Sequence, residues 1–225
     1  MRAWKLYDHF DEKELKKELW ELIIPDTVYK EDVSLTLKNS VLTFEATKRK
    51  RSENPYDWEG PRLIAKKGKH CGIRANLGLD FRNCRGNGNV YLRANGYEFL
   101  YLIGIDNLSR DVFFHTFDVN TGCYVPRGRV HFKDYFLYGG TLASPELISL
   151  GILFEDGKII YSIDEEEHEL SLKKLEKLNK RLVKDSKRIE KEGLQEVCIK
   201  VDLYAPHGEP SSIKALIDNV EVKYI

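Results

Sequence analysis

A chain of 225 residues with 42% hydrophobic and 11% aromatic residues can bury a sizeable core, which excludes an intrinsically disordered protein. Its 36 basic and 36 acidic residues cancel, so no global field attracts nucleic acid or an anionic membrane, and we expect neither as a partner. The amino-terminal stretch lacks the apolar core of a secretory signal, and no apolar run is long enough to span a bilayer. A cytoplasmic location is therefore expected, unless a signal peptide has been removed.

The four cysteines do not suggest a metal centre. They are widely spread, and none forms a CxxC pair or a Cys/His spacing typical of zinc. Asp106, Asn107 and Asp111 could ligate calcium through oxygen, but a plain turn is the simpler use of such a segment. The sequence therefore predicts no cofactor and no metal.

The first half of the chain has the period-two pattern of β-strands. VSLTL (33–37) and VLTFEAT (41–47) are joined by a three-residue polar loop, which predicts a hairpin. Residues 48–61 are polar, contain two prolines and predict a long loop. Further strand-like runs follow between residues 70 and 119, separated by Gly- and Asn-rich turns.

The stretch from 147 to 163 is the clearest hairpin signal. Two apolar, β-prone runs flank Asp156-Gly157, a dipeptide that favours a tight turn. The pattern then changes from alternation to helical spacing. Leucines and an isoleucine recur at this spacing in a Lys- and Glu-rich background, and Gly193 is a candidate for the end of the helix. These observations predict one long helix over about 168–192, with Glu165 to Glu169 at its amino end.

The last 30 residues return to strand over 196–205 and 213–225. About a dozen short strands with turns between them bury their apolar faces most naturally in two packed antiparallel sheets. We therefore predict an all-β protein, a single domain over 1–225 with the architecture of a two-sheet jelly-roll sandwich and the helix as an insertion.

Four stretches carry a resemblance to the concanavalin A-like lectin/glucanase superfamily. They are Tyr7-Asp8-His9-Phe10 with Trp20, the hairpin over 33–47, the hairpin over 147–164, and ALIDNVEVKYI at 215–225. The resemblance implies a jelly-roll fold and a carbohydrate ligand.

The sequence departs from the glucanases of that superfamily in one respect. Those enzymes carry Glu, Asp and Glu at alternating positions of one concave strand, where the acids can flank a glycosidic bond. No β run here has this pattern. Asp164, Glu166 and Glu169 come nearest by spacing, and solvated acids at a helix amino end explain them more simply. A lyase using Tyr, His and Arg is not excluded by this absence.

Candidate ligand-binding residues are aromatic side chains that stack on sugar rings and polar side chains that bind hydroxyl groups. In the proline-flanked loop and beside it we select Tyr56, Asp57, Trp58 and Arg62, and in the strands Arg74, Arg93 and His115. Each has a plain alternative: Trp58 can fold onto the core, the arginines can be solvated, and His115 can be a hydrogen-bonded core residue.

Three functions remain open from the sequence. The favoured one is a lectin-like carbohydrate-binding domain without catalysis, because the acid triplet is missing. The first alternative is a polysaccharide or oligosaccharide hydrolase or lyase with an atypical site. The second is a structural or interaction protein whose inserted helix contacts a partner, so a homo-oligomer is left open.

Overall fold

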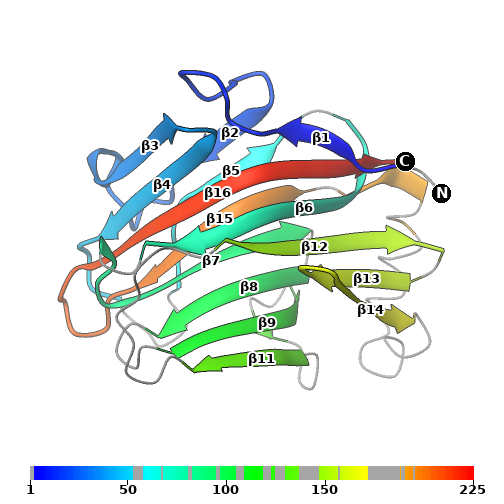
Figure 1. Ribbon diagram of the computed structural model, residues 1–225. Helices are drawn as coiled ribbons and strands as arrows, with labels where there is room; N and C mark the ends of the chain where they lie inside the picture. The colour runs from blue at the N-terminus through cyan, green and yellow to red at the C-terminus, as the bar shows by residue number, and fades with distance from the viewer. Residues whose placement is uncertain are drawn as a thin grey trace.

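The computed structural model describes residues 3–52, 58–66, 68–80, 83–94, 97–104, 109–118, 123–124, 130–136, 147–156, 158–171, 188, 191–194 and 196–225, with backbone and strand pairing only from 97 to 136. These residues form two antiparallel sheets, as predicted (Figure 1). Sheet 1 has the order β14-β13-β12-β6-β16-β4-β3, with β1 beside β16, and sheet 2 has the order β10-β9-β8-β7-β15-β5-β2, with β11 beside β9.

The strands of sheet 1 are β1 (Lys5–Asp8), β3 (Val33–Lys38), β4 (Val41–Lys48), β6 (His70–Leu79), β12 (Ile148–Glu155), β13 (Lys158–Ile163), β14 (Glu166–Ser171) and β16 (Ser211–Tyr224). Those of sheet 2 are β2 (Trp20–Ile23), β5 (Arg62–Ala65), β7 (Asn87–Ala94), β8 (Tyr97–Gly104), β9 (Ser109–Asp118), β10 (Cys123–Tyr124), β11 (Val130–Phe136) and β15 (Val197–Tyr204). A 3-10 turn, η1 (Lys30–Asp32), precedes β3.

The core lies between the two sheets and follows directly from the alternation of residues along each strand. In β4, Leu42, Phe44 and Ala46 are buried while the intervening residues are half-buried on the outer side. In β15, Ile199, Val201 and Leu203 are fully buried in the same core. Because side chains of a strand point alternately to opposite faces, each sheet keeps a second, outer face.

Both predicted hairpins are confirmed. Asn39 and Ser40 have φ of 53° and 59°, the positive pair of a two-residue turn that matches strand twist, so Lys38 pairs with Val41. Strands β12 and β13 pair from Leu150–Ile163 to Glu155–Lys158.

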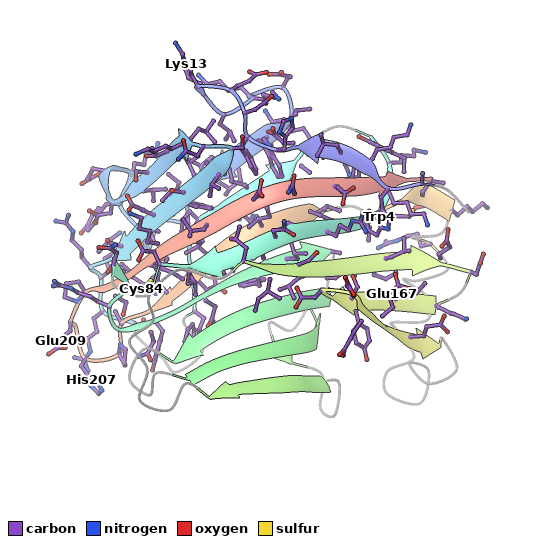
Figure 2. The ribbon with its side chains drawn as sticks, viewed as in Figure 1. Trp4, Lys13, Cys84, Glu167, His207 and Glu209 are labelled. Atoms are coloured by element: carbon purple, nitrogen blue, oxygen red, sulfur yellow. The ribbon has the colours of Figure 1, made fainter. Side chains whose placement is uncertain are left out.

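The predicted helix over 168–192 is not supported. Glu166–Ser171 form β14, antiparallel to β13, so the acidic run does not begin a helix. The turn at Asp164, with φ of 50°, returns the chain along the open edge of β13, where backbone hydrogen bonds outweigh helix propensity. Exposed Glu167 and Glu169 then keep this edge strand charged, which discourages pairing with another chain (Figure 2).

The whole leucine stripe, Leu175, Leu178, Leu182 and Ile189, lies outside the described residues. Residues 188, 191 and 192 are helical, and Gly193 follows with φ of 87°.

The segment from Tyr7 to Phe10, with its aromatic and acidic side chains, joins the two sheets. The buried Asp8 carboxylate accepts hydrogen bonds from Trp20 Nε1 at 2.9 Å and from Phe10 N at 3.0 Å. Tyr7 donates to the Leu19 carbonyl at 2.6 Å and packs edge-on against Trp20. Since β1 belongs to sheet 1 and β2 to sheet 2, this motif is structural: it fastens one sheet to the other.

Candidate functional site on the outer face of sheet 2

The outer face of sheet 2 carries a set of polar side chains from three adjacent strands. Because the odd-numbered residues of β15 enter the core, Lys200 and Asp202 lie on the outer face. Strand pairing sets Arg62 of β5 and Tyr91 of β7 opposite Lys200, and Asn89 of β7 opposite Asp202. We call the following six residues the sheet 2 polar face: Arg62, Asn89, Tyr91, Arg93, Lys200 and Asp202.

One carboxylate lies between the two arginines of this face. Glu196 immediately precedes β15, and its Oε2 lies 3.8 Å from Arg62 Nη2 while its Oε1 lies 3.8 Å from Arg93 Nε. The Arg93 side chain is only 12% exposed. Glu196 therefore lies within ion-pair distance of two guanidinium groups that come from different strands.

A second group of contacts on the same face is centred on Asp202. The Tyr91 hydroxyl donates to Asp202 Oδ2 at 2.7 Å. Lys200 Nζ lies 2.8 Å from Asp202 Oδ1 and 5.6 Å from the centre of the Tyr91 ring. The ammonium group is thus held by one carboxylate and one aromatic ring, and its charge is balanced locally.

Several polar atoms of this face have no hydrogen-bond partner. Among the described residues five buried side-chain N or O atoms lack one, and three of them belong here: Arg62 Nε, Asn89 Oδ1 and Asp202 Oδ1. Asp202 Oδ1 is nevertheless compensated by the Lys200 ammonium at 2.8 Å, which leaves Arg62 Nε and Asn89 Oδ1 as the two atoms of this face without compensation. A buried polar atom without a partner costs about 1–3 kcal/mol, so this face can gain free energy by binding a polar ligand.

An aromatic pair lies at one end of the same face. Glu59 pairs with Leu203, which sets Trp58 beside Tyr204, and the two rings stack with centres 5.2 Å apart and planes 18° apart. Gly60 permits this approach, because a Cβ there would lie 1.7 Å from the Val201 carbonyl oxygen. Trp58 is therefore half-buried, with one ring face against Tyr204 rather than inserted into the core.

The sequence-predicted residues divide between the two sheets. Trp58, Arg62 and Arg93 lie on the outer face of sheet 2, with the two arginines beside Glu196 and Trp58 at the Tyr204 end. His115 of β9 is in register with Glu98 of β8, which is in register with Arg93, so its position belongs to the same face.

The other three predicted residues do not join this group. Arg74 lies in β6 of sheet 1, where it pairs with Glu221 and lies 4.9 Å over the Trp4 ring. Tyr56 and Asp57 are outside the described residues.

Four residues of the site were missed by the sequence reasoning: Asn89, Glu196, Lys200 and Asp202. A usable signal was present for two of them, because Lys200 and Asp202 occupy alternate positions of an otherwise apolar strand, VCIKVDLY. Glu196 precedes the strand and carried no signal, since its contacts join β5 to β7 across β15.

The sheet 2 polar face has no feature of a metal centre. Across the part of the chain that the structure describes, no three His, Cys, Asp or Glu side chains are grouped to hold a metal ion. Asp106 and Asn107, two of the calcium candidates, lie outside the described residues. Within the described residues, no helix has both the length and the apolar character to cross a membrane.

The fold is that of the concanavalin A-like jelly roll, as the resemblance implied. The catalytic domain of an endo-1,3-beta-glucanase (laminarinase) from Thermotoga petrophila RKU-1 superposes with a TM-score of 0.62 and 14% identity, covering 99% of this chain and 98% of that one. An endo-beta-1,3-glucanase from Pyrococcus furiosus gives 0.55 and 13%, covering 99% and 95%. No protein-family model matches the sequence, and no curated protein matches it.

Proposed function

We propose that the outer face of sheet 2 binds a polysaccharide or oligosaccharide. The observation that carries the proposal is a pair of buried atoms without a partner on one face of one sheet, the donor Arg62 Nε and the acceptor Asn89 Oδ1. A sugar hydroxyl both donates and accepts, so a chain of hydroxyl groups can satisfy both kinds of atom.

Charge and aromaticity favour the same class of ligand. Arg62, Arg93 and Lys200 are opposed by Glu196 and Asp202, so the face lacks the large excess of one sign that selects a highly charged ligand. The Trp58–Tyr204 stack ends the face with an apolar aromatic surface of the kind that packs on sugar rings. The glucanases named above supply the glycans to test first.

Isothermal titration with laminarin oligosaccharides and mixed-linkage glucan oligosaccharides tests this proposal. We expect Asn89→Leu and Arg93→Ala to weaken binding about tenfold each, equivalent to about 1.4 kcal/mol. Arg74→Ala is the matched control, since it removes an arginine from the outer face of the other sheet, and it should change affinity less than about twofold. Equal losses in Arg74→Ala and Arg93→Ala, or no binding to any glucan, would contradict the proposal.

Hydrolysis of the bound glycan is the second candidate, and one observation favours it. Glu98 of β8 is in register with Arg93 on one side and with His115 on the other, across adjacent strands about 4.8 Å apart. The register therefore sets one acidic position between an arginine and a histidine position on the same face, and these are residue types used for general acid or base work. The glucanase neighbours support this alternative better than the lectin-like function favoured from the sequence.

Reducing-sugar release from laminarin and mixed-linkage glucan separates the two candidates. If the protein is a hydrolase, Glu98→Gln should abolish release while leaving oligosaccharide binding within about twofold. Glu167→Gln, on the exposed edge strand of sheet 1, should leave release unchanged. Binding without release by the unaltered protein would assign a non-catalytic function.

A further inference from the structure

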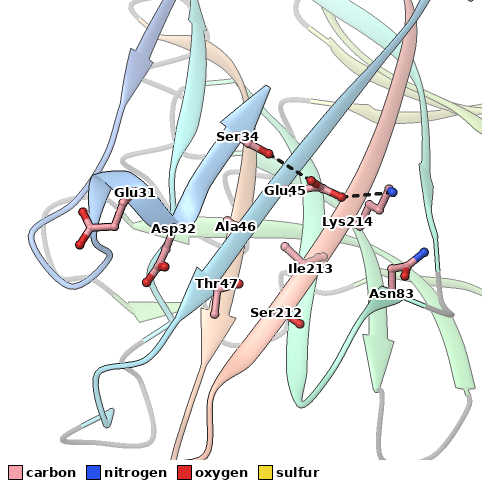
Figure 3. A pocket seen from close by; sticks show the side chains of 10 residues that line it. All are labelled: Glu31, Asp32, Ser34, Glu45, Ala46, Thr47, Asn83, Ser212, Ile213 and Lys214. Carbon is pink, nitrogen blue, oxygen red and sulfur yellow. Dashed lines mark hydrogen bonds and ion pairs between the residues drawn. The ribbon is translucent and has the colours of Figure 1, made fainter. Parts of the chain in front are cut away.

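A separate hollow lies on the outer face of sheet 1, away from the sheet 2 polar face. It has a volume of about 380 Å³, within the range of small-molecule sites. Glu31 and Asp32 of η1 line one side, Asn83 the other, and Glu45 of β4 and Lys214 of β16 lie between them (Figure 3). We call this feature the η1 pocket.

The η1 pocket has an excess of negative charge. Lys214 Nζ lies 3.1 Å from Glu45 Oε1 and 3.7 Å from Asp80 Oδ2, and Arg49 pairs with Asp32 Oδ1. Among the lining residues and their ion-pair partners, four carboxylates (31, 32, 45 and 80) are opposed by two cations (49 and 214), so two negative charges remain. A ligand that enters should be cationic, because it removes part of this repulsion.

Asp32 supplies an independent sign of a missing ligand. Its side chain is only 3% exposed although it lines the η1 pocket. Its Oδ1 accepts from Arg49, whereas its Oδ2 is buried and has no hydrogen-bond partner. A buried carboxylate oxygen without a donor is costly, and the missing group must be an N–H or O–H donor.

The spacing of the acids selects the kind of cation. No three acidic, His or Cys side chains in the described part of the chain are close enough together to hold a metal ion. Hydroxyl groups of Ser34, Thr47 and Ser212 and the Asn83 amide complete the lining, so the η1 pocket can hydrogen-bond an extended ligand at several points. We propose that the η1 pocket binds a small organic cation bearing primary ammonium groups, one of which donates to Asp32 Oδ2.

Titration of the full chain with 1,4-diaminobutane, followed by calorimetry and amide chemical shifts, tests the proposal. We expect saturable binding with shifts centred on Glu31, Asp32 and Thr47, and no binding of the uncharged analogue 1,4-butanediol. Asp32→Asn should weaken binding at least tenfold. Glu31→Gln, at an exposed position where folding is not at risk, should weaken it about threefold by removing one of the two uncompensated charges.

Glu167→Gln is the matched control, because it removes one negative charge from the same sheet at its opposite edge. It should leave the affinity within twofold. No saturable binding, equal binding of 1,4-butanediol, or equal effects of Glu31→Gln and Glu167→Gln would overturn the proposal. The glucan titrations of sheet 2 are independent of this result, so either proposal can fail alone.

Discussion

The outer faces of the two sheets follow the same alternation but balance their charges differently. On sheet 1 three cations each pair with an acid of the same sheet: Arg74 with Glu221, Lys223 with Glu155, and Lys158 with Glu169. On sheet 2, Arg62 and Arg93 share Glu196, while Lys200 and Tyr91 share Asp202. Arg62 Nε and Asn89 Oδ1 of that second face remain without a partner.

The difference lies in how the polar groups of each face are satisfied. The three pairs on sheet 1 satisfy one another, and the outer face of that sheet keeps an excess of negative charge at the η1 pocket. Unpartnered groups on sheet 2 reduce stability and are retained where a ligand completes them. Four stability measurements test this difference between the two sheets.

Gly60→Ala should be the most damaging change. The new Cβ would meet the Val201 carbonyl oxygen at 1.7 Å, so the segment carrying Trp58 must move away from β15. We expect a loss of about 3 kcal/mol in the free energy of unfolding, measured by chemical denaturation, and a red shift of tryptophan emission. Gly208→Ala, with open space but φ of 79°, should cost only about 1 kcal/mol. Equal losses would show that the close approach does not exist.

Lys223→Ala tests whether an ion pair on sheet 1 contributes to the free energy of unfolding. The Lys223 side chain is 4% exposed, and its ammonium lies 3.0 Å from Glu155, whose side chain is 24% exposed. Removing the lysine leaves a partly buried carboxylate unpaired, and we expect a loss of about 2–3 kcal/mol in chemical denaturation. Lys223→Met keeps the stem in place, so its smaller loss should report the charge alone. An unchanged midpoint in both variants would contradict the pairing.

Cys84 offers a pH-dependent test beside sheet 1. Burial raises the pKa of its thiol from 9.0 to about 11, and the thiol donates to the Asp80 carbonyl at 3.3 Å. Below pH 9 the thiol is protonated in both states. Between pH 9 and 11 the unfolded chain loses the proton while the folded chain keeps it, so this contribution to stability falls as pH rises.

The expected loss across that window is about 3 kcal/mol. Denaturation from pH 8 to 11 should show it as the difference between the unaltered protein and Cys84→Ala, which removes the titrating group. Parallel pH profiles for the two proteins would rule out a buried Cys84 thiol.

Lys158→Ala should have the smallest effect. Its ammonium lies 2.7 Å from Glu169, and hydrogen bonding to that carboxylate raises the pKa of Lys158, yet both side chains are well exposed. Water and salt screen such a pair, so we expect the denaturation midpoint to change by no more than the error of measurement. A double-mutant cycle with Glu169→Ala checks this. A large coupling would mean that edge strand β14 depends on the ion pair.

The prediction of two antiparallel sheets was correct because period-two alternation and turn residues are local signals. Asn39-Ser40 and Asp156 set hairpins within a few residues, and no long-range information is needed. The predicted start of the long helix was wrong for the opposite reason. Glu166 to Ser171 have charged residues compatible with a helix, but the free edge of β13 is a tertiary partner that a local pattern does not reveal.

In the candidate site, too, local alternation predicts which residues share a face, whereas strand pairing decides to which sheet they belong. Alternation within β7 is a local signal that places Arg93 on the same face as Tyr91. Arg74 gave an equally good signal and yet lies on the other sheet, because membership of a sheet depends on which strands pair.

By itself, the sequence determined which residues of each strand face the core and which face outward, because the backbone repeats every two residues. Only the tertiary structure decided that β15 lies between β5 and β7, more than 100 residues earlier in the chain. That non-local pairing brings Glu196 between Arg62 and Arg93 and leaves Asn89 Oδ1 without a donor.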